Sequence, residues 1–205
     1  MIKGELFIIS SPAGAGKTTL TNLLLEEDEK LKRVITYTTR KKRKNEIDGV
    51  DYVFVAKEVF ELMIKENAFL EYAIVHGNYY GTPKKETFEL LNQGFDVILV
   101  IDVQGMKQIK SVIPEAISIF ILPPSLKELE SRMRIRGESE EEIQKRLETA
   151  KREIPHWKEY DYIIINENLL ESKENLSHII KSQRFKRQRF NLSLIKDDEL
   201  RSLML

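Results

Sequence analysis

Residues 5–19, ELFIISSPAGAGKTT, decide the fold of this chain. Residues 6–9 form an apolar run that is rich in β-forming residues and too short for a helix, which predicts a buried parallel strand. A segment of small residues follows, and then Leu20, Leu23 and Leu24 recur at helical spacing. A strand, a glycine-rich turn and a helix in this order place backbone N–H groups and a helix N-terminus around an anion-sized hollow. The stretch therefore predicts a phosphate-binding loop.

Side chains of this loop would act on phosphates directly. The positively charged ammonium of Lys17 would bind the β- and γ-phosphates, and the hydroxyl of Thr18 could ligate Mg²⁺. Ser11 stands where the pattern G-x-x-x-x-G-K-[ST] has its first glycine, so the turn must tolerate a Cβ there. The alternative is a glycine-rich turn that binds nothing, which the strand before it and the helix after it disfavour. The residues expected to contact the nucleotide phosphates are Ser11, Pro12, Ala13, Gly14, Ala15, Gly16, Lys17 and Thr18.

Composition narrows the class of protein. The chain has 205 residues with 33 basic and 33 acidic side chains, so no overall charge favours nucleic acid or a membrane surface. It has no cysteine, which excludes disulfides and thiolate metal sites and suits a reducing compartment. The first strand begins almost at the N-terminus, and no apolar run reaches the length of a membrane span. We therefore expect one compact domain with insertions, no signal peptide and a cytoplasmic location.

The order of strands and helices predicts an α/β fold. Continuous apolar runs such as VILVI and IFIL are typical of strands that helices cover on both faces. Alternating strands and helices imply right-handed crossovers and a three-layer core around a parallel sheet. The expected strands are residues 6–9, 34–39, 52–55, 97–102, 117–122 and 162–165. The expected helices are residues 17–26, 57–66, 84–93, 106–112, 125–135, 140–153 and 170–181.

The interval 34–82 breaks this alternation. It contains short β-like pieces, polar aromatic residues and the basic run 40–44, and it predicts an inserted antiparallel subdomain. Taken alone, the basic run is equally consistent with a solvated loop. The adjacent Tyr79 and Tyr80 lie between glycines, where their hydroxyls could donate to a phosphate while their rings pack. Glu71 precedes these tyrosines, and the alternative to a binding role for Glu71 is an exposed acid on the surface. For His76, which lies beside the tyrosines in the sequence, a structural role is favoured over a place in the acceptor site.

Residues 125–153 have the character of a mobile lid. The segment is highly charged, and Gly137 lies at a candidate hinge. Arg132 and Arg136 are four residues apart and would share one helix face, and Arg146 follows in the next helix. The alternative is a pair of solvent-exposed helices whose arginines form ion pairs with the many neighbouring glutamates.

These pieces together resemble the guanylate kinase family. The motifs that carry the resemblance occur in family order over about residues 4–183: SPAGAGKTT, TYTTRKKR, DYVFV, AFLEYA, GNYYGTP, IDVQG, IFILPPS, RMRIRG and YDYIIIN. The resemblance implies a P-loop kinase core with a parallel sheet, a GMP-binding insertion and a helical lid. The implied divisions are a core of residues 4–33, 83–124 and 154–183, an insertion of residues 34–82, a lid of residues 125–153 and a C-terminal helical extension of residues 184–205.

The resemblance assigns two groups of residues to the acceptor, GMP and also dGMP. Those that would hold its phosphate are Arg40, Arg43, Tyr52 and Tyr80. Those that would face its guanine are Thr36, Glu71 and Thr82. Guanidinium groups bind phosphate in bidentate fashion, so paired arginines suit a monophosphate. The Glu71 carboxylate could accept from the N1–H and the 2-amino group of guanine, whereas adenine would leave it unpaired, at about 1–3 kcal/mol or more.

The remaining residues belong to the donor side and to the reacting groups. Asp102, in IDVQG, matches an acidic residue near the acceptor and metal region. Asn166 matches a position beside the base of ATP. The residues that would neutralise the transferring phosphoryl group are Lys17, Arg132, Arg136 and Arg146. The implied reaction is ATP + GMP → ADP + GDP with Mg²⁺, and it needs in-line placement and preorganised positive charge rather than a general base.

The chain departs from the family pattern at several positions. Lys42 and Asn45 replace a proline and a glycine that commonly shape the phosphate-gripping loop, and Ala13 replaces a common serine. Val100 stands where many members have an aspartate two residues before Asp102, which weakens any metal-site inference. Each of these changes leaves the lysine, arginines and remaining acid of the motif in place.

Two other functions stay open at this point. One is a binding module that has lost catalysis and holds a phosphopeptide in the acceptor site, which the intact Gly16-Lys17-Thr18 disfavours. The other is a kinase for a different phosphorylated acceptor, which Glu71 and Thr36 disfavour because both suit a guanine edge. Residues 184–205 predict an added helix packed on the domain or on a second subunit, so a monomer or a homodimer is expected. A basic tail that binds nucleic acid is the less favoured alternative.

Overall fold

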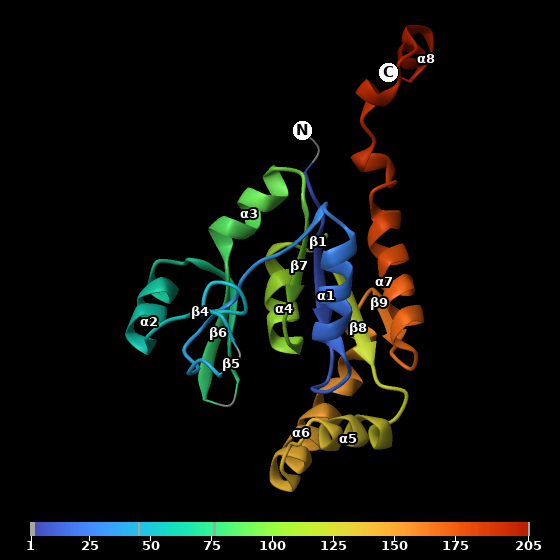
Figure 1. Cartoon of the computed structure of the whole chain (residues 1–205). Coiled ribbons are helices and arrows are strands. Elements are labelled where there is room, and N and C mark those ends of the chain that lie inside the picture. Colours follow the sequence, from blue (N-terminus) through green and yellow to red (C-terminus); the bar gives the residue numbers. More distant parts are fainter. Residues whose placement is uncertain (1–2, 45, 76, 205) are drawn as a thin grey trace.

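The computed structural model describes residues 3–44, 46–75 and 77–204. Asn45 and His76, which the sequence singled out, lie outside these described residues. Figure 1 shows a central sheet covered by helices, a smaller sheet to one side and a pair of helices below the central sheet. The α/β fold class with a parallel sheet is confirmed.

The central sheet contains five parallel strands in the order β2-β7-β1-β8-β9. Its centre is β1 (Leu6–Ser10), flanked by β7 (Asp96–Val100) and β8 (Ile117–Leu122), with β2 (Leu31–Arg33) and β9 (Tyr162–Ile165) at the edges. All five residues of β1 are buried, as expected for a strand between two helical layers. The continuous apolar runs of the sequence therefore form the middle of the sheet.

Alternate residues of β1 enter two different cores. Phe7 and Ile9 pack with residues of α1 (Lys17–Glu27) and α7 (Leu169–Gln183) on one face. Leu6 and Ile8 pack with residues of α3 (Lys84–Asn92) and α4 (Val103–Val112) on the other. This alternation follows from the two-residue period of a strand, and it gives the three-layer arrangement that the sequence predicts.

The inserted segment forms a four-stranded sheet in the order β4-β3-β6-β5, with α2 (Lys57–Lys65) beside it. Its strands are β3 (Tyr37–Thr38), β4 (Val53–Phe54), β5 (Phe69–Val75) and β6 (Asn78–Pro83). Most pairings are antiparallel, as expected, but β3 and β4 pair in parallel. A stack of three rings, Phe60 between Phe69 and Tyr79, packs α2 against this sheet.

The lid segment consists of α5 (Leu126–Ile135) and α6 (Glu140–Glu153), followed by the 3₁₀ helix η1 (Ile154–Glu159). Ser125 caps α5 by accepting from the backbone N–H of Glu128, and Ser139 starts α6 with a complete capping box. The inward residues of both helices form a small apolar cluster together with Ala15 of the glycine-rich loop. The lid therefore packs directly on that loop.

Several expected boundaries are wrong. The strand expected at residues 97–102 ends at Val100, and Asp102 instead caps α4. β2 was not expected, because its three residues contain a single buried apolar side chain and no periodic pattern. β5 and β6 were not expected as separate strands, because one buried acid, three tyrosines and a glycine interrupt their apolar pattern. The strand expected at 34–39 is reduced to Tyr37 and Thr38.

Beyond α7 the chain forms short helical segments rather than one added helix. They are η2 (Arg187–Arg189), η3 (Leu192–Leu194) and the six-residue α8 (Asp198–Leu203). Figure 1 shows this segment extending away from the sheets. Its start is held by Arg184 and Arg189, which both pair with the buried Asp96, at 2.6 and 2.9 Å. Within the described residues, no helix is long and apolar enough to cross a membrane.

Candidate functional site

The glycine-rich loop connects β1 to α1 in a conformation that requires glycine at two places. Gly14 and Gly16 have φ of 91° and 96°, a region that L-residues rarely adopt. Ser11 tolerates its Cβ, because among the described residues the only non-glycine with a positive φ is Asn67. The Ser11 hydroxyl donates to the Pro12 carbonyl at 3.0 Å. The departure at Ser11 therefore leaves the turn intact.

Asn166, at the end of β9, supports this loop from below. Its side-chain Nδ2 donates to the Ala15 carbonyl at 2.7 Å, and the residue is only 3% exposed. A Cβ added to Gly16 would lie 2.3 Å from the same Nδ2. The structure thus gives Asn166 a place under the loop, while its expected position beside the base of ATP stays a prediction.

A cavity of about 360 Å³ opens over the loop. Arg136 and Arg146 of the lid face it together with the start of α1. Arg146 also pairs with Glu138 at 3.0 Å. The loop and helix residues that line the cavity are Ser11, Pro12, Ala13, Gly14, Gly16, Lys17, Thr18 and Thr19. A polyanion placed here would meet a helix N-terminus and three cationic side chains.

Arg132 is held away from this cavity. Its Nε donates to Glu128 at 2.8 Å, and its Nη2 donates to the Asn166 carbonyl at 3.0 Å. The structure therefore brings two of the three predicted lid arginines to the loop, and it connects the third to the residue that supports the loop. A phosphate contact by Arg132 stays a prediction.

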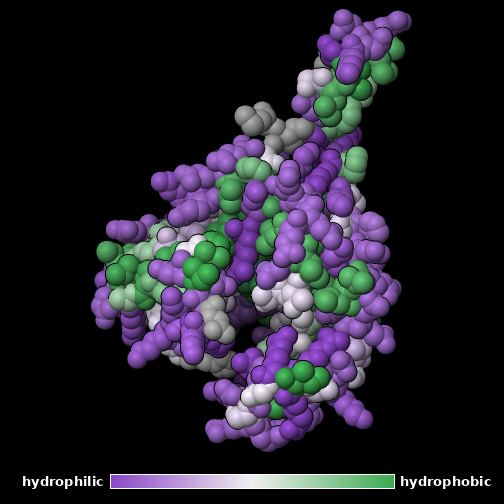
Figure 2. All heavy atoms as spheres, in the orientation of Figure 1, coloured by the Kyte–Doolittle hydropathy of each residue, from purple (hydrophilic) through white to green (hydrophobic). Residues whose placement is uncertain are grey.

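A second cavity, of about 440 Å³, lies between the insertion and the core. Lys17 and Thr18 line both cavities, so the two spaces meet end to end at the start of α1. Figure 2 shows the surface hollowed between the insertion, the core and the lid. The predicted acceptor residues that line this second cavity are Thr36, Arg43, Tyr52, Glu71, Tyr80 and Asp102.

Arg40 lies at the edge of this cavity and is already paired. It forms a two-point ion pair with Glu46, at 2.6 and 3.1 Å, and its Nε donates to the Tyr80 hydroxyl at 3.2 Å. Its guanidinium also lies over the Tyr52 ring, 5.4 Å from the centroid. Glu46 raises the pKa of Arg40, which fixes the positive charge there. Sequence reasoning missed Glu46, although it is the first acid after the basic run, which was a signal for it.

Glu71 lies on β5 at the floor of the second cavity. It is 4% exposed, and burial raises its pKa to about 7. The Thr82 hydroxyl donates to its Oε1 at 2.6 Å, and its Oε2 lies against Gly105 of α4, where an added Cβ would be 2.8 Å away. Thr82 is buried and orients this carboxylate, and a direct contact of Thr82 with a base stays a prediction.

Lys17 lies at the junction of the two cavities among acidic groups. Burial lowers the pKa of Lys17, and the negative charges of Glu153 and then Asp102 act in the opposite direction. Asp102 is also the N-cap of α4, because its Oδ1 accepts from the backbone N–H of Gly105 at 2.8 Å. Sequence reasoning missed this effect of Glu153, because nothing in a lid helix indicates that the charge of its last residue acts on Lys17. In the part of the chain that the structure describes, no group of three or more His, Asp or Glu side chains could hold a metal ion.

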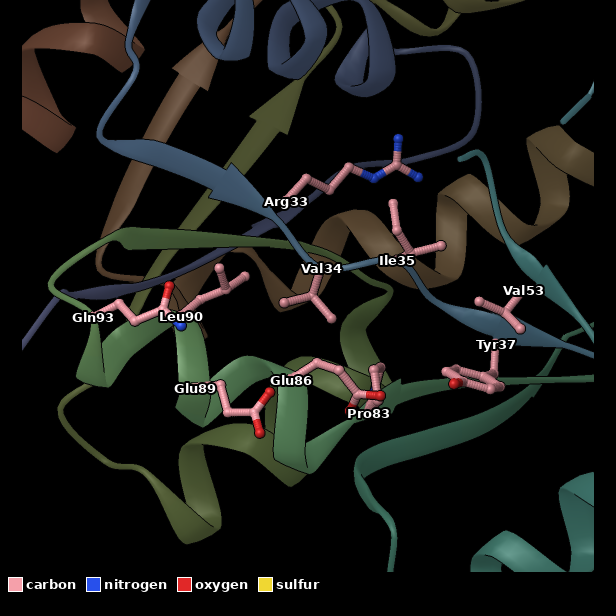
Figure 3. Close-up of a pocket in the computed structure, with 10 residues that line it drawn as sticks. All are labelled: Arg33, Val34, Ile35, Tyr37, Val53, Pro83, Glu86, Glu89, Leu90 and Gln93. Atoms are coloured by element: carbon pink, nitrogen blue, oxygen red, sulfur yellow. The ribbon is translucent and has the colours of Figure 1, made fainter. Parts of the chain in front are cut away.

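A third cavity, of about 330 Å³, lies where the insertion joins the core. Figure 3 shows it between the linker from β2 to β3 and helix α3, with Val34 and Leu90 lining it and Arg33 directed away from Glu86 and Glu89. Of its lining residues only Arg33 also lines the second cavity. Since the glycine-rich loop and the paired arginines are elsewhere, this space is not a part of the phosphate site.

The chain is similar to known proteins over most of its length. A family model described as guanylate kinase matches residues 3–183. A guanylate kinase of Clostridioides difficile is 48% identical over 195 residues, which cover 95% of each chain. A guanylate kinase of Rickettsia bellii is 50% identical over 186 residues, covering 90% of this chain and 97% of that protein. The crystal structure of guanylate kinase from Anaplasma phagocytophilum superimposes with a TM-score of 0.78 at 35% identity, covering 92% of this chain and 90% of that one.

Proposed function

This chain belongs to the guanylate kinase family, and from that premise we propose how its residues carry out the reaction. The activity is that of an ATP:GMP phosphotransferase, which moves the γ-phosphoryl group of ATP to GMP. The proposal concerns which residues act on each substrate. The observation that carries it is that Lys17 and Thr18 line both cavities. With both substrates bound, one ammonium would then face the donor and the acceptor phosphates together.

The donor nucleotide would occupy the cavity over the glycine-rich loop. Backbone N–H groups at the start of α1 and the Lys17 ammonium would bind its phosphates. Arg136 and Arg146 line the same cavity from the lid, where they would neutralise charge on the transferring group. Arg132 would join them after leaving Glu128, and Asn166 would contact the base in addition to supporting the loop.

The acceptor would occupy the cavity between the insertion and the core. Arg43, Tyr52 and Tyr80 line it, and the GMP phosphate would draw Arg40 from Glu46 into the same grip. The acceptor atom is already an anionic phosphate oxygen, so the chemistry requires placement and charge neutralisation rather than a general base. Asp102 would lie close to the acceptor phosphate, where it also caps α4.

The choice of guanine would come from Glu71. Its carboxylate can accept from N1–H and the 2-amino group together, and Thr36 can donate to O6. Adenine offers a lone pair at N1 and no 2-amino group, so the buried carboxylate would lose its partners. The sugar hydroxyl has no part in this pairing, which supports dGMP as a second acceptor.

The donor set near Lys17 fits Mg²⁺ carried by the substrate. Thr18 offers one hydroxyl oxygen, and the described residues hold no cluster of carboxylates or imidazoles that would form a complete protein cage. This suits Mg²⁺, which keeps several waters and binds through few protein groups and substrate phosphates. When bound, Mg²⁺ would reduce the negative charge of the donor phosphates, and Thr18 is the residue that would hold it.

The division into regions follows the same proposal. Residues 4–33, 83–124 and 154–183 would form the core, residues 34–82 the GMP-binding part, residues 125–153 the lid and residues 184–205 an extension. We propose that the protein acts as a monomer or a homodimer in the cytoplasm, without nucleic acid or membrane partners.

The alternative function, a binding module that has lost catalysis, is disfavoured because the loop, Lys17 and two lid arginines line one cavity.

A coupled assay with ATP, Mg²⁺ and GMP, dGMP, AMP, CMP or UMP tests the assignment. GMP and dGMP should be phosphorylated, and the others should react poorly. Lys17→Met should lower kcat by several orders of magnitude with the fold retained, and Glu71→Gln should reduce the preference for GMP over AMP by tenfold or more, about the value of one lost charged hydrogen bond. An unchanged kcat in the first variant would reject the donor site, and an unchanged GMP:AMP ratio in the second would reject the account of Glu71.

A further inference from the structure

Strand β5 carries a β-bulge directly before the residue proposed to select guanine. Its pairing with β6 shifts register between Phe69 and Glu71. In a regular strand, residues two apart point to the same face of the sheet. Here Phe69 stacks on Phe60 of α2, with ring centroids 4.4 Å apart, whereas Glu71 lines the acceptor cavity together with Ala73 and Val75. The bulge therefore turns the Glu71 carboxylate from the α2 side of the sheet to the acceptor side.

A side chain of α4 holds the backbone just after this bulge. β5 is the last strand of the small sheet, so none of the described strands pairs with its outer edge. The Gln108 amide of α4 takes that place, because its Oε1 accepts from the Tyr72 N–H at 3.2 Å and its Nε2 donates to the Tyr72 carbonyl at 2.9 Å (Figure 1). This two-point contact resembles the pairing with a neighbouring strand, and it holds the residue that follows Glu71.

Gly105 lies one turn before Gln108 on α4 and leaves room for the carboxylate itself. Residues three apart share a helix face, so both residues can contact β5. A Cβ added to Gly105 would lie 2.8 Å from Oε2 of Glu71 and 3.2 Å from its carboxyl carbon. One face of α4 thus sets both the backbone beside Glu71 and the space for its carboxylate.

We propose that Gln108 and Gly105 are positioning residues for the choice of the acceptor base. Gln108 holds the bulged strand so that Glu71 faces the guanine, and Gly105 keeps the space of the carboxylate open. The inference rests on the proposed role of Glu71 and adds the contacts that aim it. A carboxylate displaced by a fraction of an ångström loses its paired hydrogen bonds to N1–H and the 2-amino group, while the phosphate grip is untouched. The effect therefore falls on acceptor selection rather than on phosphoryl transfer.

The first test removes the two bonds to Tyr72. Gln108→Met keeps a side chain of similar length but has no amide. It should lower the ratio of kcat/KM for GMP to kcat/KM for AMP roughly fivefold, the factor expected for one ordinary hydrogen bond. The loss should lie in the KM for GMP, and the KM for ATP should equal that of the parent. Gln144→Met is the matched control, because Gln144 is exposed on α6, donates to Glu140 at 3.0 Å and should leave the ratio unchanged.

The second test changes the space of the carboxylate without removing a hydrogen bond. Alanine is a better helix former than glycine, and the atoms nearest to the added Cβ belong to the end of the Glu71 side chain. Gly105→Ala should therefore remain folded, which thermal unfolding measures, and should lower the GMP:AMP ratio by a similar factor. This variant carries the comparison if Gln108→Met does not fold.

A double-mutant cycle with Glu71→Gln separates positioning from a merely structural role. In that background neither Gln108→Met nor Gly105→Ala should lower the ratio further, since the carboxylate that they aim is absent. A loss that persists there, or an equal rise in the KM for ATP, would overturn the proposal. A ratio unchanged in either single variant, beside a clear loss in Glu71→Gln, would reject the role of that residue and leave the proposed function standing. An unchanged ratio in Glu71→Gln itself would reject the proposed function of Glu71 and this inference with it.

Discussion

The side-chain amide of Asn166 donates to the carbonyl of Ala15 at 2.7 Å, which joins two segments that lie 151 residues apart in the chain. The first segment is the loop that would hold ATP, and the second is the end of the last strand of the core sheet. Arg132 of the lid donates to the backbone carbonyl of the same Asn166. One buried residue therefore connects the loop, the sheet and the lid.

Replacing Asn166 should disturb ATP binding through the loop. Asn166→Ala would leave the buried Ala15 carbonyl without its partner, which costs about 1–3 kcal/mol of stability. The KM for ATP should rise, and the KM for GMP should change little because the acceptor cavity is untouched. Urea unfolding and steady-state kinetics check both parts. An ATP KM equal to that of the parent would show that the loop keeps its shape without this bond.

A side chain at Gly16 should be harmful for two separable reasons. Gly16→Ala would strain a backbone with φ of 96° and would also place a Cβ 2.3 Å from Asn166 Nδ2. Gly49→Ala is the matched control, because Gly49 has φ of 77° but nothing within 4 Å of its added Cβ. The control should lose about 1 kcal/mol from backbone strain alone. Gly16→Ala should lose more stability and most ATP binding, and equal losses in both variants would contradict the clash.

The buried carboxyl of Glu71 predicts how stability depends on pH. Its pKa is about 7 in the folded chain against a reference value of 4.5, so between these values the folded state binds more protons than the unfolded state. The free energy of unfolding should therefore fall as pH rises through this window, by about 3 kcal/mol in total from this group. Glu71→Gln should remove that part of the slope. Denaturant unfolding of parent and variant from pH 4 to 8 measures the difference, and parallel curves would contradict it.

GMP binding should have the opposite pH dependence. Only the ionised Glu71 can accept both donors of the guanine edge, so acceptor affinity should rise as pH increases toward 7. The phosphate of GMP also titrates, and this affects parent and variant alike. The Kd for GMP of the parent should therefore fall more steeply with pH than that of Glu71→Gln. Calorimetry at pH 5.5, 6.5 and 7.5 gives both slopes, and identical slopes would remove Glu71 from guanine recognition.

The start of the C-terminal extension should contribute to stability through Asp96. This side chain is 2% exposed and pairs with both Arg184 and Arg189. Asp96→Asn would remove the carboxylate that the two guanidinium groups share, and among the described residues only Asp28 beside Arg184, at 2.8 Å, and Glu5 beside Arg189, at 3.9 Å, would remain. The cost should be about 3 kcal/mol. Asp198→Asn is the control, because Asp198 is 91% exposed and pairs with Arg201 at the surface, where an ion pair contributes about 0–1 kcal/mol. Similar unfolding midpoints for the two variants would argue against the Asp96 cluster.

Sequence reasoning was most successful where chemistry and periodicity agree. The run LFII, the glycines at 14 and 16 and the leucines of α1 predict a strand, a glycine-rich turn and a helix, and each is present. The apolar runs at 97–100 and 117–122 likewise form inner strands of the sheet. Sequence reasoning was less successful for β2, β5 and β6. Their residues have a weak local preference for the strand conformation, and pairing with other strands in the folded protein determines it.

Local sequence patterns specify the phosphate-binding loop, the parallel α/β core and the residue types that suit two nucleotides, because strand and helix periods and glycine conformations are local properties. The packing of distant segments specifies which charges meet. That packing paired Arg40 with Glu46, joined Thr82 to Glu71 by a hydrogen bond and brought Asn166 to the loop. The physical reason is that ion pairs and buried hydrogen bonds depend on distances between segments far apart in the chain, which no local pattern encodes.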